Sequence, residues 1–382
     1  MLKLIRSQQM PKCDILVFDI IGAGWIGQCL PDGVCSTTIC FRNEVPIVLS
    51  LRFLLGVLRG LFRYSPLKPA WLSTLLLNGA VEHTSAKLIV SAADNNLTLA
   101  RFSAKNNKLE TLLIQNALRG VAGQIAPKQK LPTYLAFGET EWILFSQLGI
   151  SCEKYLPIGS IKLGLALEKH DKALLETDKI AFVSHYRPSM VYRGGSTTER
   201  LIERNQRRLF SACIEYIGSS NHQLVVLTKS RNSDDQEAER LYYVNLSGQK
   251  QLSFVTPDKA ERELDSYHAG LSVALVVHPG STLGFELFSA GQKVITGASA
   301  DSDLIDAWGM SEYFRALPSF TKLRADREMR DFGALADKLL EMRTEEYLER
   351  TAESRSLLMS IPSDTSPHIR VRQIIEEILN RA

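Results

Sequence analysis

The feature of this sequence that most constrains its fold is the repeated alternation of short apolar segments with segments of helical periodicity. In the second half of the chain, the apolar segments predict strands at 180–184, 223–228, 251–255, 272–277 and 293–296. Helical patterns separate them, at 199–217, 234–242, 258–268 and 282–290. Strands that alternate with helices predict a parallel sheet with helices on both faces. We therefore expect a doubly wound sheet of at least five strands in this half.

The first half has the same rhythm. Its apolar segments predict strands at 15–21, 36–41, 87–91, 111–115, 133–137 and 154–158, with helices at 45–62 and 96–106. A chain of 382 residues exceeds a usual single hydrophobic core. The predicted fold class is therefore α/β, with two Rossmann-like, doubly wound parallel-sheet domains that face a cleft. Because 165–178 is charged and lacks strand character, the expected divisions are 1–168, 176–362 and a C-terminal helix in 363–382 that would pack back on the first domain.

Charge and cysteine content exclude several classes of protein. The 45 basic and 42 acidic residues give a net charge of +3, too mild for the concentrated basic face of a nucleic-acid-binding protein. The first residues lack the apolar run and cleavage site of a signal peptide, so we expect a cytoplasmic protein. None of the six cysteines forms a C-x-x-C pair and the histidines lack i, i+4 spacing, so we expect free thiols and no metal site.

The most apolar segment, 45–62, leaves two interpretations open. It is interrupted by Arg52 and Arg59 and is shorter than the roughly 20 residues of a membrane-spanning helix. In the first interpretation it is a buried or half-buried helix of the first domain. In the second it lies in a membrane interface with Arg52, Arg59 and Arg63 on its wet side. The second interpretation predicts peripheral contact with the inner face of a membrane.

The strongest functional signal is the segment HPGSTLGFE at 278–286, which follows a predicted strand and opens a predicted helix. Its small residues let the backbone approach a ligand, and the N–H groups at a helix start favour phosphate. Glu286, about one turn into the helix, is placed to accept hydrogen bonds from a ribose diol. The alternative is a well-capped turn with nothing bound, in which His278 is a packing residue.

At this point the sequence shows a family resemblance. The segment 278–295 resembles the G-S-T-x-G-x-E-x-x-x-x-G-x-x-V stretch of surface carbohydrate (capsule or O-antigen) biosynthesis proteins, which are similar to GT-B glycosyltransferases. Further segments resemble that family in the same order, at 15–19, 42–44, 94–95, 114–120, 158–162 and 184–187. Ala117 departs from the pattern, because the family has a glycine there. The resemblance extends from about residue 15 to the end, and the order of the motifs carries it.

The resemblance implies a C-terminal domain that binds a nucleotide-sugar donor. The donor-binding residues expected on this basis are His278, Gly280, Ser281, Thr282, Gly284, Glu286, Lys229, Arg231, Ser184, Tyr186, Arg187 and Ser160. Lys229 and Arg231 follow a strand, where a cation would stabilise the charge that develops on the leaving phosphate. The alternative is that both are ordinary solvated loop charges.

The N-terminal domain would then hold the acceptor. Asp94 is the first candidate for the carboxylate that removes a proton from the acceptor hydroxyl or attacks the anomeric carbon, and Asp19 is the second. An ordinary helix N-cap is the alternative for Asp94. On the acceptor side we expect Gln115, Asn116 and Arg119, which follow the strand at 111–115.

A rival motif lies in the first domain. Residues 22–27 satisfy G-x-G-x-x-G, and Glu44 lies 22 positions beyond Gly22, near the place of the ribose-binding acid in a dinucleotide fold. Asp19, Ile20 and Ile21 lie between the apolar run 15–18 and Gly22, whereas that fingerprint turns directly. A dinucleotide interpretation also leaves the 278–286 segment without a role.

The sequence therefore predicts a glycosyltransferase that moves a sugar from a nucleotide-activated donor to a surface polysaccharide or a lipid-linked precursor. A CMP-linked ulosonic acid such as Kdo is one donor that the resemblance suggests. We expect no cofactor and no metal. The alternatives are a nucleotide-sugar epimerase of the same fold, and a non-catalytic nucleotide-binding subunit of a glycan assembly complex.

Overall fold

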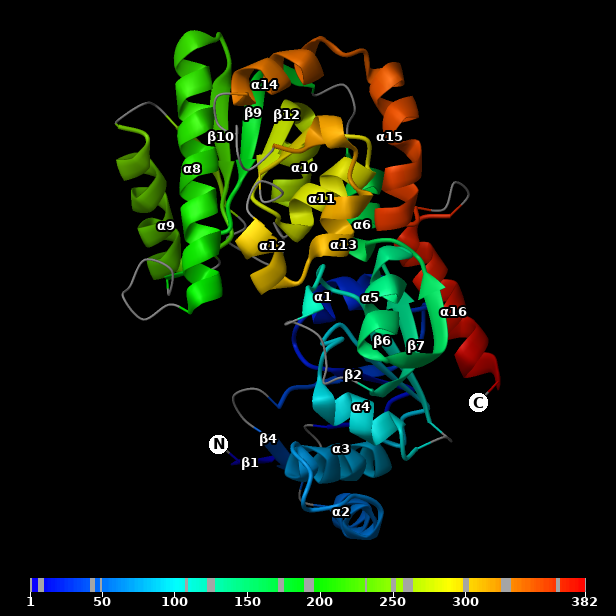
Figure 1. Ribbon diagram of the computed structural model, residues 1–382. Coiled ribbons are helices and arrows are strands. Elements are labelled where there is room, and N and C mark those ends of the chain that lie inside the picture. The colour runs from blue at the N-terminus through cyan, green and yellow to red at the C-terminus, as the bar shows by residue number, and fades with distance from the viewer. Residues whose placement is uncertain are drawn as a thin grey trace. The chain divides into compact units, whose positions relative to one another are not determined.

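The computed structural model forms two compact units, and each is described by itself (Figure 1). Unit 1 comprises Met1–Arg119, Gly123–Ile161 and Pro362–Ala382, and unit 2 comprises Gly120–Ala122 and Lys162–Ile361. The structure describes residues 2–5, 10–41, 45–48, 50–106, 109–121, 128–170, 175–188, 196–230, 232–248, 252–256, 264–297, 302–323, 331–361 and 365–381.

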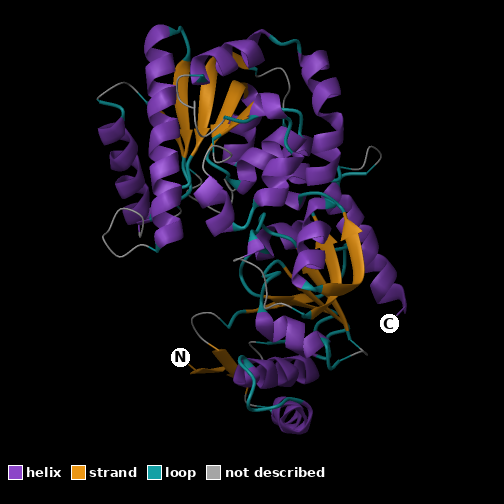
Figure 2. Cartoon of the chain, in the orientation of Figure 1, coloured by secondary structure: helices purple, strands orange, loops and turns teal. Residues whose placement is uncertain are grey.

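Unit 2 is built on a parallel five-stranded sheet (Figure 2). The strands are β9 (Glu176–Val183), β10 (Gln223–Leu227), β11 (Ser253–Val255), β12 (Val273–His278) and β13 (Val294–Thr296), in the spatial order β11-β10-β9-β12-β13. The helices are α6 (Ile161–Lys169), α8 (Thr197–Ser219), α9 (Ser233–Leu246), α10 (Asp265–Ser272), α11 (Thr282–Ser289), α12 (Ser302–Trp308), α13 (Ser311–Ala316), α14 (Phe332–Glu341) and α15 (Thr344–Leu358), with the 3-10 turn η5 (Ser319–Thr321). α8, α10, α11 and α14 contact the strands.

Unit 1 is built on a parallel six-stranded sheet. Its strands are β2 (Ile15–Phe18), β3 (Ser36–Ile39), β5 (Leu88–Ser91), β6 (Glu110–Ile114), β7 (Lys130–Ala136) and β8 (Ser151–Pro157), in the order β3-β2-β5-β6-β7-β8. A separate parallel pair joins β1 (Leu2–Ile5) and β4 (Val45–Val48). The helices are α1 (Ala23–Gln28), α2 (Leu51–Arg63), α3 (Trp71–Thr84), α4 (Leu97–Ser103), α5 (Thr140–Leu148) and α16 (Pro367–Arg381).

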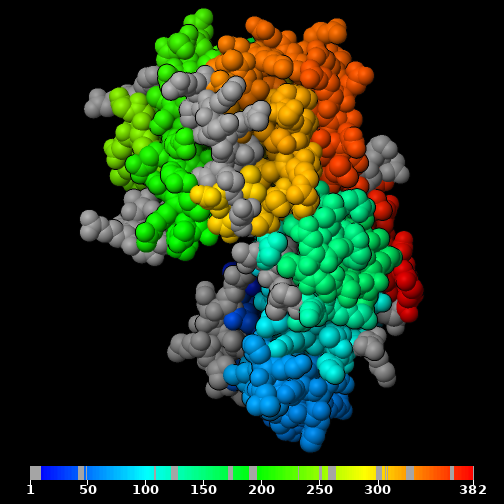
Figure 3. Space-filling model, viewed as in Figure 1, coloured from blue at the N-terminus to red at the C-terminus, as the bar shows by residue number. Residues whose placement is uncertain are grey.

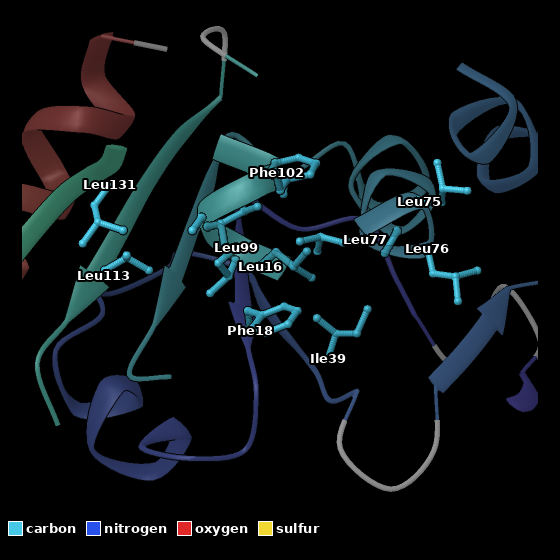
Figure 4. Close-up of a cluster of buried hydrophobic side chains, with 14 of the residues drawn as sticks. Leu16, Phe18, Ile39, Leu75, Leu76, Leu77, Leu99, Phe102, Leu113 and Leu131 are labelled. Atoms are coloured by element: carbon cyan, nitrogen blue, oxygen red, sulfur yellow. The ribbon is translucent and has the colours of Figure 1, made fainter. Parts of the chain in front are cut away.

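The core of unit 1 explains why its strands read as continuous apolar runs. β2 and β5 are buried along their whole length, because helices cover a parallel sheet. Figure 4 shows Leu16 and Phe18 of β2 among Leu77 of α3 and Leu99 and Phe102 of α4. Each such side chain contributes about 1.5–3 kcal/mol by leaving water.

Both predicted doubly wound sheets are present, and two local predictions are wrong. The predicted helix 45–62 begins only at Leu51, where the Ser50 hydroxyl accepts from the Phe53 N–H at 3.1 Å, and 45–48 is strand β4. A short run with valine and isoleucine suits a strand, and periodicity cannot separate it from a following helix. The charged stretch 165–178 is not without structure, since α6 runs to Lys169 and β9 begins at Glu176.

Two further findings concern helices. The C-terminal helix α16 belongs to unit 1, and its Arg372 donates to the Gln28 carbonyl at 2.9 Å. No helix among the described residues is both long and apolar enough to cross a membrane.

Close packing of α2 on α3 gives the first testable prediction. A Cβ on Gly56 would lie 2.9 Å from the Asn78 carbonyl oxygen, whereas nothing lies within 4 Å of a Cβ on Gly27. We expect Gly56→Ala to lower the free energy of unfolding by about 1–2 kcal/mol, because overpacking outweighs the better helix propensity of alanine. The matched control Gly27→Ala should raise it by about 0.5 kcal/mol. Urea unfolding measures both, and equal effects of the two variants would contradict the prediction.

Candidate functional site

The strand order of unit 2 defines where a ligand can bind. From β9 the chain passes to β10 and β11 on one side of the sheet, and later to β12 and β13 on the other side. The loops after β9 and β12 therefore leave in opposite directions, and ligands of such sheets bind in the crevice outside these carboxyl ends. The predicted segments 184–187 and 278–286 follow these two strands.

His278 ends β12 and holds the loop in place. Its side chain is fully buried, Nδ1 accepts from the Gly280 N–H at 3.2 Å, and Nε2 lies 2.8 Å from the Thr296 hydroxyl. Since Nδ1 is an acceptor, Nε2 carries the proton and donates to Thr296. Burial lowers the pKa of His278 to about 3, so the ring is neutral. His278 therefore positions the loop, and its ring nitrogens are both engaged inside unit 2.

Two glycines are required by this loop. Gly280 has φ +112°, a conformation that side chains rarely adopt, and a Cβ on Gly284 would lie 2.1 Å from the His278 ring. α11 begins directly afterwards, and the hydroxyl of its N-cap, Ser281, makes no capping hydrogen bond. Ser281 and Thr282 are half-buried. The first turn of a helix presents N–H groups without intrahelical partners, so this end of α11 suits an anion.

Glu286 lies on the second turn of α11 and is 1% exposed. The Tyr267 hydroxyl of α10 donates to its Oε2 at 2.7 Å. The carboxylate is therefore held by a phenol and does not lie in a purely apolar interior. A ribose contact at Glu286 stays a prediction.

Two cations lie at the carboxyl edge of the sheet. Lys229 follows β10 and Arg187 follows β9, the neighbouring strand, and both side chains are exposed. Although solvent reaches Lys229, the protein crowded around its ammonium and the charge of Arg187 lower its pKa to about 8. Arg187 also lies 4.0 Å from Glu199. Arg231 falls outside the described residues.

A buried acid that the sequence analysis missed supports these cations. Glu239 of α9 is fully buried and accepts from the Lys229 N–H at 3.0 Å and from the Ser230 N–H at 2.8 Å. It also accepts a short hydrogen bond from the Ser184 hydroxyl. Glu239 thereby fixes the loops after β9 and β10 to α9. Nothing in the local sequence separates Glu239 from the exposed acids of the same helix.

Other predicted donor residues are placed inside unit 2 or unit 1. Ser184 accepts from the Tyr243 hydroxyl at 2.9 Å, and Tyr186 is 4% exposed with its ring against Tyr242. His185 is buried, and burial together with the Lys229 and Arg187 charges lowers its pKa well below the usual value. Ser160, in unit 1, is fully buried.

The sheet of unit 1 has its own switch point, between β2 and β5. Asp19 follows β2 and Asp94 follows β5. Asp19 is 1% exposed and has φ +77°, and its Oδ1 accepts from the Ile21 N–H at 3.1 Å. A non-glycine residue in this conformation is strained, which is frequent at functional sites.

Asp94 is the centre of an ion pair. Arg119 donates to Asp94 Oδ1 from its terminal nitrogen at 2.6 Å and to both carboxylate oxygens from Nε at 3.2 Å. The Tyr134 hydroxyl adds a bond to Oδ2 at 3.0 Å. Asp94 is not the N-cap of α4, because Asn96 accepts from the Thr98 N–H. Burial would lower the pKa of Arg119, but the neighbouring Asp94 outweighs it and raises that pKa.

Gln115 links the ends of β6 and β7. Its amide donates to Glu141 at 2.8 Å and its carbonyl accepts from the Phe137 N–H at 2.7 Å. Asn116 is half-buried beside it. The structure thus assigns Gln115 a part in shaping the edge, and Asn116 is the more accessible of the two.

The rival glycine motif lacks the packing that a dinucleotide fingerprint needs. Gly22 has φ +76° and little space around it, but nothing lies within 4 Å of a Cβ on Gly24 or Gly27. The third glycine of that fingerprint exists for close helix–strand packing, and Gly27 has no such contact. Glu44 lies outside the described residues, as does the whole segment 42–44. Among the described residues, no cluster of His, Cys, Asp and Glu forms a potential metal site.

Three solved structures of other proteins resemble this chain over nearly its whole length. MnaA of S. aureus with UDP has a TM-score of 0.55 at 11% identity, with 98% of each chain covered. UDP-GlcNAc 2-epimerase from Neisseria meningitidis, bound to UDP-GlcNAc, has a TM-score of 0.51 at 13% identity, with 96% of this chain and 99% of that chain covered. The wall teichoic acid polymerase TagF has a TM-score of 0.52 at 12% identity, with 98% and 90% covered. These likenesses show the fold, which is of the GT-B type.

The family is shown by its sequence model. The family described as "putative O-antigen biosynthesis protein" matches residues 112–320, more than half of the chain. The chain belongs to this family, and the resemblance to surface carbohydrate biosynthesis proteins is confirmed. No curated protein matches the sequence.

The state of His278 gives the second prediction. Below the ordinary histidine pKa of 6.5, the His278 ring binds a proton in the unfolded chain but stays neutral in the folded chain. The free energy of unfolding therefore falls as the pH falls. We expect this one group to remove about 2 kcal/mol between about pH 7 and pH 5. Nitrogen NMR of histidine-labelled protein should show a neutral ring protonated at Nε2 at pH 5, with the spectrum of His278→Gln as the assignment control. A signal that titrates near 6.5 would contradict the buried, hydrogen-bonded ring.

Proposed function

We propose that this protein is a glycosyltransferase that uses a nucleotide-sugar donor in the assembly of a surface glycan. The observation that carries the proposal is the placement of Arg187, Lys229 and the N-terminal turn of α11 at the carboxyl edge of the unit 2 sheet, after the neighbouring strands β9, β10 and β12. Positive charge and oriented N–H groups at one place favour a diphosphate.

Glycosyl transfer needs this charge most at the moment of bond cleavage. The bond from the sugar to the nucleotide breaks, and negative charge grows on the leaving phosphate. Fixed cations and a helix N-terminus that face this charge stabilise the transition state more than the bound donor. In this proposal Lys229 and Arg187 face the phosphates, Ser281 and Thr282 bond them, and Glu286 receives the ribose.

The acceptor chemistry is assigned to unit 1. In the proposal Asp94 takes the proton of the acceptor hydroxyl, or attacks the sugar. The Arg119 guanidinium, however, engages both oxygens of this carboxylate. Asp94 can therefore act only when the acceptor or donor displaces Arg119, and Asp19 is the second candidate.

The nucleotide itself is proposed to be a pyrimidine nucleotide. Structures with the same fold were solved with UDP, UDP-GlcNAc and CDPG. A CMP-linked ulosonic acid such as Kdo remains within this class. A lipid-linked precursor or growing glycan is the proposed acceptor.

Titration calorimetry with UDP, CMP, GDP and NAD tests the donor site and gives the third prediction. Affinity for UDP should fall about tenfold between pH 7 and pH 9, because Lys229, with a pKa of about 8, loses its charge while the phosphates stay ionised. The control variant Lys229→Arg should remove this pH dependence, since arginine stays charged. Lys229→Gln should weaken binding about tenfold at pH 7. Binding of NAD alone would contradict the proposal. So would an affinity for UDP that stays the same at pH 9, in Lys229→Arg and in Lys229→Gln.

Turnover of the donor gives the fourth prediction. Asp94→Asn should lower kcat by about a hundredfold to ten-thousandfold while UDP affinity stays unchanged. The same substitution at Asp19 tests the second candidate, and thermal unfolding of both variants separates catalysis from folding. Release of free nucleotide or of an isomerised sugar without any acceptor would assign the epimerase alternative. Tight nucleotide binding without turnover on any acceptor would instead point to the non-catalytic subunit.

A further inference from the structure

Helix α2 of unit 1 exposes an apolar face to solvent. Among the described residues, eight of the fifteen exposed large hydrophobic side chains lie between residues 51 and 72. Six of them are on α2, namely Leu51, Leu54, Leu55, Leu58, Leu61 and Phe62, with exposed fractions from 41% to 95%. At about 100° per residue these six fall within an arc of roughly 120°. Figure 3 shows this blue segment on the surface of unit 1.

The opposite face of α2 is fixed to the protein. Phe53 and Gly56 are buried against α3, and the Asn78 amide of α3 donates to the Gly56 carbonyl at 2.7 Å. A Cβ on Gly60 would lie 2.7 Å from the Leu75 side chain. The packing is therefore complete on the inner side, and the outer leucines are not part of it. The inner side of the helix agrees with the first sequence interpretation, a half-buried helix of the first domain.

Three arginines line one edge of the apolar face. Arg52 donates to the Ser85 hydroxyl at 3.2 Å, Arg59 pairs with Glu82 at 2.9 Å, and Arg63 donates to Asn106. These bonds hold the arginines between the outer face and α3. α2 contains no Asp or Glu, and Lys68 follows it.

We propose that the outer face of α2 docks on the surface of an anionic lipid bilayer. An interfacial helix buries its apolar face at the boundary of headgroups and acyl chains, with arginines at the headgroup level. Anionic lipid attracts such arginines, and this attraction is strongest close to the surface. A second copy of the chain fits less well, because the arginine edge of one α2 would meet no acid on another α2. The proposal does not rest on the glycosyltransferase assignment.

Vesicle flotation with the full chain tests the surface and gives the fifth prediction. Wild-type protein should float with vesicles of phosphatidylcholine mixed with phosphatidylglycerol, and more weakly with phosphatidylcholine alone. Leu58→Glu, at a side chain 52% exposed, should lower vesicle binding at least about tenfold, because a charge enters the apolar face. The matched control Leu241→Glu, at a leucine 50% exposed on α9, should bind as the wild type does. The double variant Arg52→Gln with Arg63→Gln should lose the preference for anionic vesicles.

Two results would overturn the proposal. One is vesicle binding by Leu58→Glu that equals that of the wild type. The other is a wild-type protein that does not bind vesicles and is a dimer in light scattering, while Leu58→Glu is a monomer. That result would assign the face to a second copy of the chain. Thermal unfolding confirms that both surface variants fold. UDP calorimetry should be equal for wild type and Leu58→Glu, so that failure of the membrane proposal and failure of the donor site are distinguishable.

Discussion

The order of the strands in each parallel sheet is the constraint on which the proposed sites depend. In each unit the chain leaves its first strand toward one side and later returns to the other side, so two neighbouring loops part at the carboxyl edge. Asp19 and Asp94 follow the parting strands of unit 1, and Arg187 and the 278–286 segment follow those of unit 2. The strand order therefore sets the position of each candidate residue, because the loops themselves are short and irregular.

Buried polar groups keep these loops in place, and exposed groups next to them are left for ligands. The Glu239 carboxylate accepts hydrogen bonds from backbone N–H groups and from a hydroxyl. Both ring nitrogens of His278 are also hydrogen-bonded, one to the loop and one to Thr296 of β13. Such satisfied networks are rigid, because breaking one bond leaves a buried polar atom without its partner. Lys229 and Ser281 lie beside these networks and remain accessible. Rigid support under accessible donors is what a preorganised anion site requires.

Much of the fold could be predicted from the sequence, because buried parallel strands and amphipathic helices such as α8 leave a local pattern. Helix α3 has no such pattern: its buried residues are not confined to one face, since it packs against α2, α4 and β4. The site was predictable only in outline. The 278–286 segment is contiguous, so its residues could be found, but the Asp94–Arg119 pair and the reach of Glu239 to Ser184 join residues 25 and 55 positions apart. No single-sequence pattern specifies such distant contacts.

In the proposed function, the charge at the two switch points is the reason for assigning the phosphates to unit 2. In unit 1 the Arg119 guanidinium is already neutralised by Asp94, and the acid Glu141 lies behind Gln115. In unit 2, burial and then the charge of Arg187 lower the pKa of Lys229, while the Glu239 carboxylate is occupied by backbone N–H groups. Two cations that repel each other gain free energy when an anion comes between them. In the proposed function, this repulsion favours a diphosphate at unit 2, and unit 1 takes the neutral acceptor hydroxyl.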